Sequence, residues 1–219
     1  MSAIYQPSFS RPRLARGSED LDASHGPGVR MTFSKDEEIY GQGEDADLVY
    51  RVLSGGVRTV RVMADGRRQI GGFYRQGQWF GFETGAEHRF SAEALGASGI
   101  LVIKRSAFET FCGGDERPEL VILQHTTREL DRAQAQLLLL ACKTACEKVV
   151  SFLLMMADEV GGDRVDLPMG RQDIADYLGL TIETVSRMLT QLQRSHLIDM
   201  PHSRQVVLLD RDALMDLSE

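Results

Sequence analysis

The sequence predicts an α+β fold in which a β-rich part precedes a helix-rich part. Three observations support this prediction. Residues 29–108 contain short alternating segments separated by glycines, residues 117–141 repeat apolar side chains at helical spacing, and two short helical segments flank Gly179 before a final pair of strand-like segments. Short strands at regular spacing indicate a small barrel or roll, whereas a sustained heptad pattern indicates a long helix.

The β-rich part contains a strong hairpin signal. Two alternating segments, Val57–Met63 and Arg67–Phe73, are separated by Asp65-Gly66. Asp-Gly between alternating segments is typical of a tight turn between antiparallel strands. Residues 1–27 are rich in Ser, Arg, Pro, Gly and Asp and show no periodicity. We therefore expect a mobile N-terminal arm followed by a small β-roll.

One long helix is expected after the roll, and its sequence suggests dimerisation. A seam at spacings of three and four contains Leu120, Leu123, Thr127, Leu130, Gln134, Leu137 and Ala141. This seam of about three heptads is typical of a two-stranded coiled coil, in which polar seam residues lower stability but fix the register. The alternative is a helix that packs only on its own domain.

The C-terminal part begins with a helix expected from Thr144 to Val160, which Gly161 and Gly162 end. Residues 165–168 read as a short edge strand. Cys142 and Cys146 are expected at positions i and i+4 of a helix, which could place the two thiols on one face.

Two further helices are expected around a turn at Gly179. The first covers Arg171–Leu178, and Gly179 supplies the positive φ angle that a turn requires. The second begins at Ile182, and Thr181 suits its N-cap position. Its inward stripe consists of Val185, Met188, Leu189 and Leu192.

The outward face of this last helix carries residues that read DNA bases in other proteins. Glu183, Ser186 and Arg187 lie near its start, followed by Thr190 and Arg194. Arg can donate twice to guanine O6 and N7, a carboxylate can accept from cytosine N4, and Ser can contact bases or phosphates. The alternative is a solvated face on which Glu183 and Arg187 form a weak i,i+4 pair.

Two strand-like segments after this helix strengthen the first interpretation. Residues 197–200 and 206–209 flank the polar turn PHSRQ, which is typical of the wing of a winged helix-turn-helix. DNA-backbone contacts are expected from Arg171, Thr181, Thr190, Arg194 and Arg204. Arg171 and Arg204 could equally be ordinary surface arginines.

The charge of the chain argues against bulk attraction to DNA. The formal net charge is −7, and residues 163–219 contain six arginines, no lysine and ten carboxylates. Specific binding must therefore depend on a few well-placed arginines, and non-specific binding should be weak and salt-sensitive.

The segment RQDIADYLGLTIETVSRML resembles the DNA-binding helix-turn-helix of the CRP/FNR superfamily of bacterial transcription regulators, and Glu-x-x-Ser-Arg is the pattern of its FNR branch. IYGQGEDADLVYRVLSGGVR and YRQGQWFGFETG are similar to its sensory β-roll. The resemblance implies that Glu183, Ser186 and Arg187 read a TTGA-type half-site and that a homodimer reads TTGA and TCAA in inverted repeat.

The residues at the ligand-binding positions of the β-roll indicate which branch of the superfamily this chain resembles. Members that bind cyclic nucleotides use a Gly-Glu-Leu motif followed by Arg-Ser-Ala, but this chain has Phe82 where that Glu would stand, and Arg89 is displaced by one position. The pattern around residues 81–94 is most similar to FixK-type proteins. Such members activate genes for low-oxygen respiration and nitrogen fixation, commonly without a bound ligand. We therefore expect no cofactor; the alternative is a sensor whose roll binds haem or a small molecule.

The cysteines and histidines support no metal centre. Cys112, Cys142 and Cys146 are too few for a four-thiolate iron–sulfur cluster, and no His lies at a ligand spacing from Cys142 or Cys146. Redox control through these thiols stays open. No phosphate-cradling or nucleophile motif is present, so we expect no enzyme activity.

The expected organisation is a mobile arm (1–27), a cyclic-nucleotide-binding-like β-roll (28–115), a long dimerisation helix (116–142) and a C-terminal winged helix-turn-helix domain (143–219). We expect the partners to be double-stranded DNA, a second copy of the chain and RNA polymerase. With no window of eighteen apolar residues and no secretory signal, a cytoplasmic protein that does not enter the membrane is expected.

Overall fold

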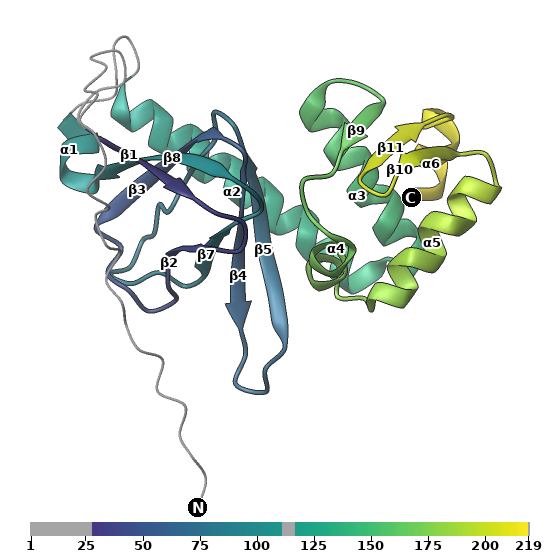
Figure 1. Cartoon of the computed structure of the whole chain (residues 1–219), viewed down its shortest axis with the longest axis horizontal. Helices are drawn as coiled ribbons and strands as arrows, with labels where there is room; N and C mark the ends of the chain where they lie inside the picture. The colour runs from purple at the N-terminus through teal and green to yellow at the C-terminus, as the bar shows by residue number, and fades with distance from the viewer. Residues whose placement is uncertain (1–27, 111–116, 219) are drawn as a thin grey trace, which may run out of the picture.

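The computed structural model describes residues 28–110 and 117–218. The arm expected at residues 1–27 and Cys112 lie outside the described residues. In chain order the protein has a β-roll, a long helix and a C-terminal unit of helices with a small sheet (Figure 1). The prediction of an α+β fold is confirmed.

The β-roll consists of two four-stranded antiparallel sheets with the strand orders β1-β8-β3-β6 and β2-β7-β4-β5. Apolar side chains from both sheets, among them Val57, Phe80 and Ile100, are buried between them. The strands are β1 (Val29–Phe33), β2 (Glu38–Tyr40), β3 (Leu48–Ser54), β4 (Gly56–Val62), β5 (Arg68–Arg75), β6 (Trp79–Phe80), β7 (Ser91–Ala94) and β8 (Ser98–Lys104).

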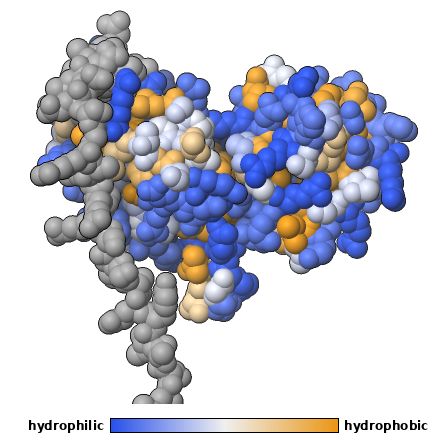
Figure 2. Space-filling view, viewed as in Figure 1, coloured by the Kyte–Doolittle hydropathy of each residue, from blue (hydrophilic) through white to orange (hydrophobic). Residues whose placement is uncertain are grey.

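The predicted hairpin is formed by β4 and β5. Val62 pairs with Arg68, and Gly66 in the turn has a φ angle of +83°, a conformation that favours glycine. The hairpin projects beyond the rest of the roll in Figure 1, and its tip forms the lower extension of the space-filling view in Figure 2.

Two helices follow the roll. The short helix α1 (Arg105–Thr110) stands where the sequence suggested a β texture, and α2 (Pro118–Cys142) is the expected long helix. Val121 and Ile122 of α2 pack against a cluster that includes Phe108. The predicted seam residues lie elsewhere on α2 and are all exposed in the single chain: Leu120, Leu123, Thr127, Leu130, Gln134, Leu137 and Ala141.

The C-terminal unit is built on helices that enclose one apolar core. Phe152, Leu178 and Val185 are buried in that core, and a three-stranded sheet with the order β10-β11-β9 completes the unit. Its elements are α3 (Ala145–Val160), β9 (Arg164–Asp166), α4 (Arg171–Leu178), α5 (Ile182–Arg194), β10 (Ile198–His202), β11 (Gln205–Leu208) and α6 (Arg211–Ser218). Helix α6 was not predicted.

The expectation that Cys142 and Cys146 could share one helical face is wrong. Lys143 is extended (φ −98°, ψ 144°), so α2 ends at Cys142. Thr144 then starts α3 with a capping box, in which its side chain accepts from the Glu147 N–H and the Glu147 side chain accepts from the Thr144 N–H. The two thiols therefore belong to different helices.

The roll and the C-terminal unit share part of one apolar core. Val60, Ile70 and Phe73 of the β4–β5 hairpin belong to the same buried cluster as residues of α3 and α4. The ring of Phe73 lies 5.4 Å from that of Tyr177 and 6.3 Å from that of Phe152. The hairpin therefore contacts the unit that carries α4 and α5.

Candidate nucleic-acid interface

Helices α4 and α5 form the predicted helix-turn-helix. Gly179 ends α4 in the left-handed conformation, with a φ angle of 62°. The Thr181 hydroxyl accepts a hydrogen bond from the backbone N–H of Thr184 at 3.2 Å, so Thr181 is the N-cap of α5 as the sequence predicted. The local sequence thus fixes both the end of α4 and the start of α5.

The amphipathic pattern decides which side of α5 faces outward. Val185, Leu189 and Leu192 are buried and Met188 is half-buried, so the predicted inward stripe packs on the unit's core. Because a helix has 3.6 residues per turn, the polar residues between them lie on the other side of the helix. Glu183, Arg187, Thr190 and Arg194 of the predicted polar set are exposed on this outward face, whereas Ser186 at its edge is half-buried.

Glu183 and Arg187 are exposed and not paired with each other. Within residues 28–110 and 117–218, neither the Glu183 nor the Arg187 side chain takes part in an ion pair. Its own backbone N–H and the Thr181 side chain lower the pKa of the Glu183 carboxyl, so it is anionic at neutral pH. Both charged groups are available to a ligand at the start of α5.

Ser186 is already engaged by a residue of α4. Nη1 of Arg171 donates a hydrogen bond to Ser186 Oγ at 3.1 Å, and Arg171 is half-buried. The Thr190 hydroxyl donates to the backbone carbonyl of Ser186 at 2.9 Å. The structure thus brings together Arg171, expected at the DNA backbone, and Ser186, expected at a base edge. Sequence reasoning missed this contact, which joins residues fifteen apart on two helices.

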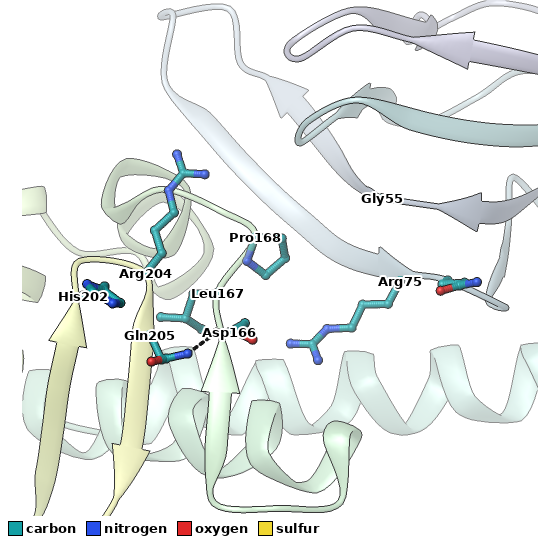
Figure 3. Close-up of a pocket in the computed structure, with 9 residues that line it drawn as sticks. Gly55, Arg75, Asp166, Leu167, Pro168, His202, Arg204 and Gln205 are labelled. Carbon is teal, nitrogen blue, oxygen red and sulfur yellow. Dashed lines mark hydrogen bonds between the residues drawn. The ribbon is translucent and has the colours of Figure 1, made fainter.

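The other predicted backbone contacts lie at the edges of the same unit. Arg194 is the last residue of α5 and Arg204 lies in the turn between β10 and β11; both are exposed. Strands β10 and β11 form the predicted wing. An open cavity of about 410 Å³ lies between the wing and the β-roll. Figure 3 shows Asp166, Pro168 and Arg204 on the wing side of this cavity, and Arg75 on the roll side.

A second cavity, of about 510 Å³, lies between the roll and α2. Its arginines are already paired, Arg89 with Glu83 and Arg132 with Glu129, each at 3.0 Å. Phe82, which replaces the expected ribose-binding carboxylate, packs against Phe108 instead, with ring centres 5.3 Å apart. The ribose-binding carboxylate of the cyclic-nucleotide motif is therefore absent from this position, and both arginines have carboxylate partners in the same chain.

Within the described residues, no three His, Cys, Asp or Glu side chains are grouped to hold a metal ion. Cys142 is exposed, whereas Cys146 is partly buried, and burial raises the pKa of the Cys146 thiol. The helices of the described segments include none long and apolar enough to span a membrane.

Comparison with known protein families divides the chain in the same way as the fold. Residues 30–115 match the model of the cyclic nucleotide-binding domain, and residues 147–217 match that of the Crp-like helix-turn-helix domain.

Curated relatives and a solved structure agree with these matches. The chain is 46% identical to the nitrogen fixation regulation protein FixK of Azorhizobium caulinodans, over 87% of this chain and 79% of that protein. It is 40% identical to FixK of Rhizobium meliloti, over 88% of each. The structure of FixK2 from Bradyrhizobium japonicum superposes with a TM-score of 0.82 at 42% identity, covering 88% of this chain and 98% of that one. These relatives are regulators and not enzymes, and the chain belongs to the FixK group of the CRP/FNR family of DNA-binding transcription regulators.

Proposed function

We propose that this protein is a homodimeric transcription activator that binds a TTGA–TCAA inverted repeat without a bound cofactor. The observation that carries the proposal is the outward face of α5, where Glu183 and Arg187 are exposed and form no ion pair among the described residues. We further propose that it controls genes for low-oxygen metabolism and nitrogen fixation, because its relatives include regulators named for nitrogen fixation.

The residue types on α5 suit reading of this repeat. Arg187 would donate to O6 and N7 of the guanine, and Glu183 would accept from a cytosine N4 amino group. Ser186 would assist at a neighbouring base. Contacts with phosphates, which position a protein without reading sequence, would come from Arg171, Thr181, Thr190, Arg194 and Arg204.

The exposed seam of α2 supports a dimer. Leu120, Leu123, Leu130 and Leu137 are 50%, 61%, 57% and 68% exposed in the single chain. Side chains of this size at heptad positions are buried when two such helices pair. A second copy on this seam would carry a second α5, and a two-fold dimer reads two half-sites about one duplex turn, roughly 34 Å, apart.

Binding without a cofactor is supported by the roll. Its larger cavity holds arginines that are already neutralised by Glu83 and Glu129. The dimer would act in the cytoplasm by recruiting RNA polymerase through surfaces of the roll and the C-terminal unit.

Native mass spectrometry of the purified protein with the repeat duplex tests this proposal. We expect a complex whose mass equals two chains and one duplex, together with no visible absorption band. A mass increment or a haem-like absorption band would indicate a ligand-gated sensor. One chain per duplex would contradict the homodimer.

A further inference from the structure

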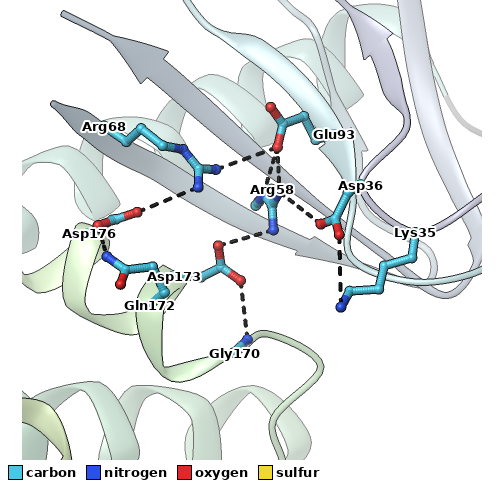
Figure 4. Close-up of polar contacts among 9 residues, drawn as sticks. All are labelled: Lys35, Asp36, Arg58, Arg68, Glu93, Gly170, Gln172, Asp173 and Asp176. Carbon is cyan, nitrogen blue, oxygen red and sulfur yellow. Dashed lines mark hydrogen bonds and ion pairs between the residues drawn. The ribbon is translucent and has the colours of Figure 1, made fainter. Parts of the chain in front are cut away.

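A cluster of charged side chains joins the β-roll to the C-terminal unit (Figure 4). Its centre is Arg58 of β4, whose side chain is only 9% exposed. Nη1 of Arg58 donates to Oδ1 of Asp173 in α4 at 3.0 Å. Nη2 and Nε donate to Oε2 of Glu93 in β7 at 2.5 and 2.8 Å, and Nη2 also donates to Oδ1 of Asp36 at 3.0 Å. One guanidinium therefore connects two strands of the roll region with a helix of the C-terminal unit.

The strand period explains how Arg58 reaches this position. Val57 is buried in the core of the roll, whereas Val60 belongs to the core that the roll shares with the C-terminal unit. Because alternate residues of a strand point to opposite faces, Arg58 shares the face of Val60. Glu93 lies directly opposite Arg58 in the sheet register.

Asp173 ties the same guanidinium to the start of α4. Its side chain is 10% exposed, and while Oδ1 accepts from Arg58, Oδ2 accepts the backbone N–H of Gly170 at 3.1 Å. Gly170 is the N-cap of α4. A carboxylate that both caps the helix and binds Arg58 restricts how the first turn of α4 lies against β4.

Arg68 extends the cluster along β5. Its guanidinium lies 3.5 Å from Glu93 and 3.8 Å from Asp176 of α4. The cluster thus contains two arginines and four carboxylates, and Lys35 lies near the exposed Asp36. Loss of Arg58 would remove the ion-pair partner of the buried Asp173, because Arg68 pairs with Glu93 and Asp176 and not with Asp173. An unpaired buried carboxylate destabilises the contact between β4 and α4.

We propose that Arg58 and Asp173 form an inter-domain clamp that holds α4 and α5 in one orientation relative to the roll. In a dimer joined along α2, this orientation sets the distance between the two α5 helices, and the clamp therefore determines which half-site spacing the dimer accepts. Helix α4 lies between the roll and α5 in Figure 1, so the clamp does not cover the outward face of α5. A guanidinium fork with several fixed acceptors is directional, unlike an apolar contact. The inference rests on the proposed dimeric DNA binding.

Three variants isolate the clamp. Arg58→Met removes the charge and the fork at similar volume, and Asp173→Asn keeps an acceptor for the Gly170 N–H while removing the charge pair. Arg58→Lys keeps the positive charge but lacks the planar guanidinium that donates to several acceptors. Arg61→Met is the matched control, because Arg61 lies on the same strand, is exposed, and its side chain has no hydrogen-bond or ion-pair partner among the described residues.

The measurement is the dissociation constant of each full-length variant, by fluorescence anisotropy, on inverted repeats of graded spacing. Lengthening or shortening the spacer by two base pairs moves the half-sites by about 7 Å along the duplex. The ratio of dissociation constants between altered and best spacing does not depend on how much of the preparation is folded. A loss of stability alone therefore leaves this ratio unchanged.

We expect the wild type and Arg61→Met to share one preferred spacing. In Arg58→Met and Asp173→Asn the ratio of dissociation constants between the altered and the best spacing should fall about tenfold. In Arg58→Lys this ratio should fall less. An unchanged spacing ratio in Arg58→Met, or an equal loss in Arg61→Met, overturns the clamp. If the wild type binds no repeat better than a scrambled duplex, the proposed function fails instead.

Hydrogen exchange of the DNA-free protein tests the Arg58–Asp173 clamp independently of DNA binding. With the clamp removed, amides in residues 68–75 and 170–178 should exchange about tenfold faster than in Arg61→Met, because both segments border the contact. Amides of α3 serve as the internal reference. Equal exchange in the two variants would overturn the clamp whatever the DNA result.

Discussion

The guanidinium of Arg171 donates a hydrogen bond to the hydroxyl of Ser186 across 3.1 Å, linking the first residue of α4 to the outward face of α5. A hydroxyl has one proton to donate and can accept at its lone pairs. Because Arg171 approaches Ser186 as a donor, the proton of Ser186 is directed elsewhere. We therefore predict that Ser186 donates to an acceptor on DNA, such as a phosphate oxygen or thymine O4, when the protein binds.

This contact predicts energetic coupling between the two residues. Arg171→Gln and Ser186→Ala should each weaken binding to the repeat, and the double variant should lose less than the two losses added together. Residues in direct contact show coupling of about 0.5–3 kcal/mol in double-mutant cycles. Anisotropy titrations of the four proteins at one salt concentration measure it. Additive losses would mean that Arg171 acts at the backbone independently of Ser186.

Arg187 should carry base specificity. Arg187→Ala is expected to weaken specific binding by about 1–3 kcal/mol and to relax the preference at one guanine. The contrasting variant is Arg194→Ala at the far end of α5, where a phosphate contact would weaken binding to all sequences alike and lower the salt slope by about 1. Titrations on duplexes substituted at each position separate the two patterns; an unaltered guanine preference in Arg187→Ala would refute its assignment.

The seam on α2 predicts a dimer that a single charge disrupts. Leu130→Glu should convert the dimer to monomer at micromolar concentration, because two carboxylates would be buried face to face. Sedimentation velocity measures the change. Leu209→Glu is the control, since Leu209 is 54% exposed but lies outside α2. A Leu130→Glu protein that remains dimeric would place the dimer contact elsewhere.

Gly179 predicts a stability effect specific to the turn. Gly179→Ala should lower the free energy of unfolding by about 1–2 kcal/mol, because its φ angle of +62° is left-handed. An added Cβ would also lie 3.3 Å from Leu140. At Gly162, where an added Cβ meets nothing within 4 Å, Ala should have little effect. Urea unfolding of both variants tests the difference, and equal stabilities would contradict it.

The lowered pKa of Glu183 predicts how binding depends on pH. Its backbone N–H and the Thr181 side chain favour the charged form, so the stabilisation is complete above the usual value of 4.5 and is lost only as pH falls through the lower folded value. The difference in binding between wild type and Glu183→Gln should therefore be constant from about pH 6 to 8. A titration of that difference within this range would indicate that another group controls Glu183.

Features set by neighbouring residues were predictable from the sequence. The Asp65-Gly66 turn, the left-handed Gly179 and the Thr181 cap each depend on a few adjacent side chains, and each is found where expected. The break between Cys142 and Cys146 was also encoded locally, because Thr144 followed three residues later by Glu147 is a capping-box pattern. Because Thr144 starts a new helix, the two cysteines do not share a helical face.

Features that depend on distant residues were not predictable. Helix α6 has eight residues and buries Leu214, and it is held by packing on α3 and by a hydrogen bond from Lys143 to the Ser218 carbonyl. A single short helix gives too little periodicity to recognise. Arg58 and Asp173 are 115 residues apart in the chain, so only the fold brings them together.

We propose that the dimer binds its repeat specifically without any ligand in the β-roll. Fluorescence anisotropy of aerobically purified protein on a TTGA–TCAA inverted repeat, compared with a scrambled duplex at the same salt, tests it most directly. We predict tight binding to the repeat and binding to the scrambled duplex weaker by at least about a thousandfold. Weak binding that does not distinguish the two duplexes would contradict the claim and would direct attention to a ligand of the β-roll.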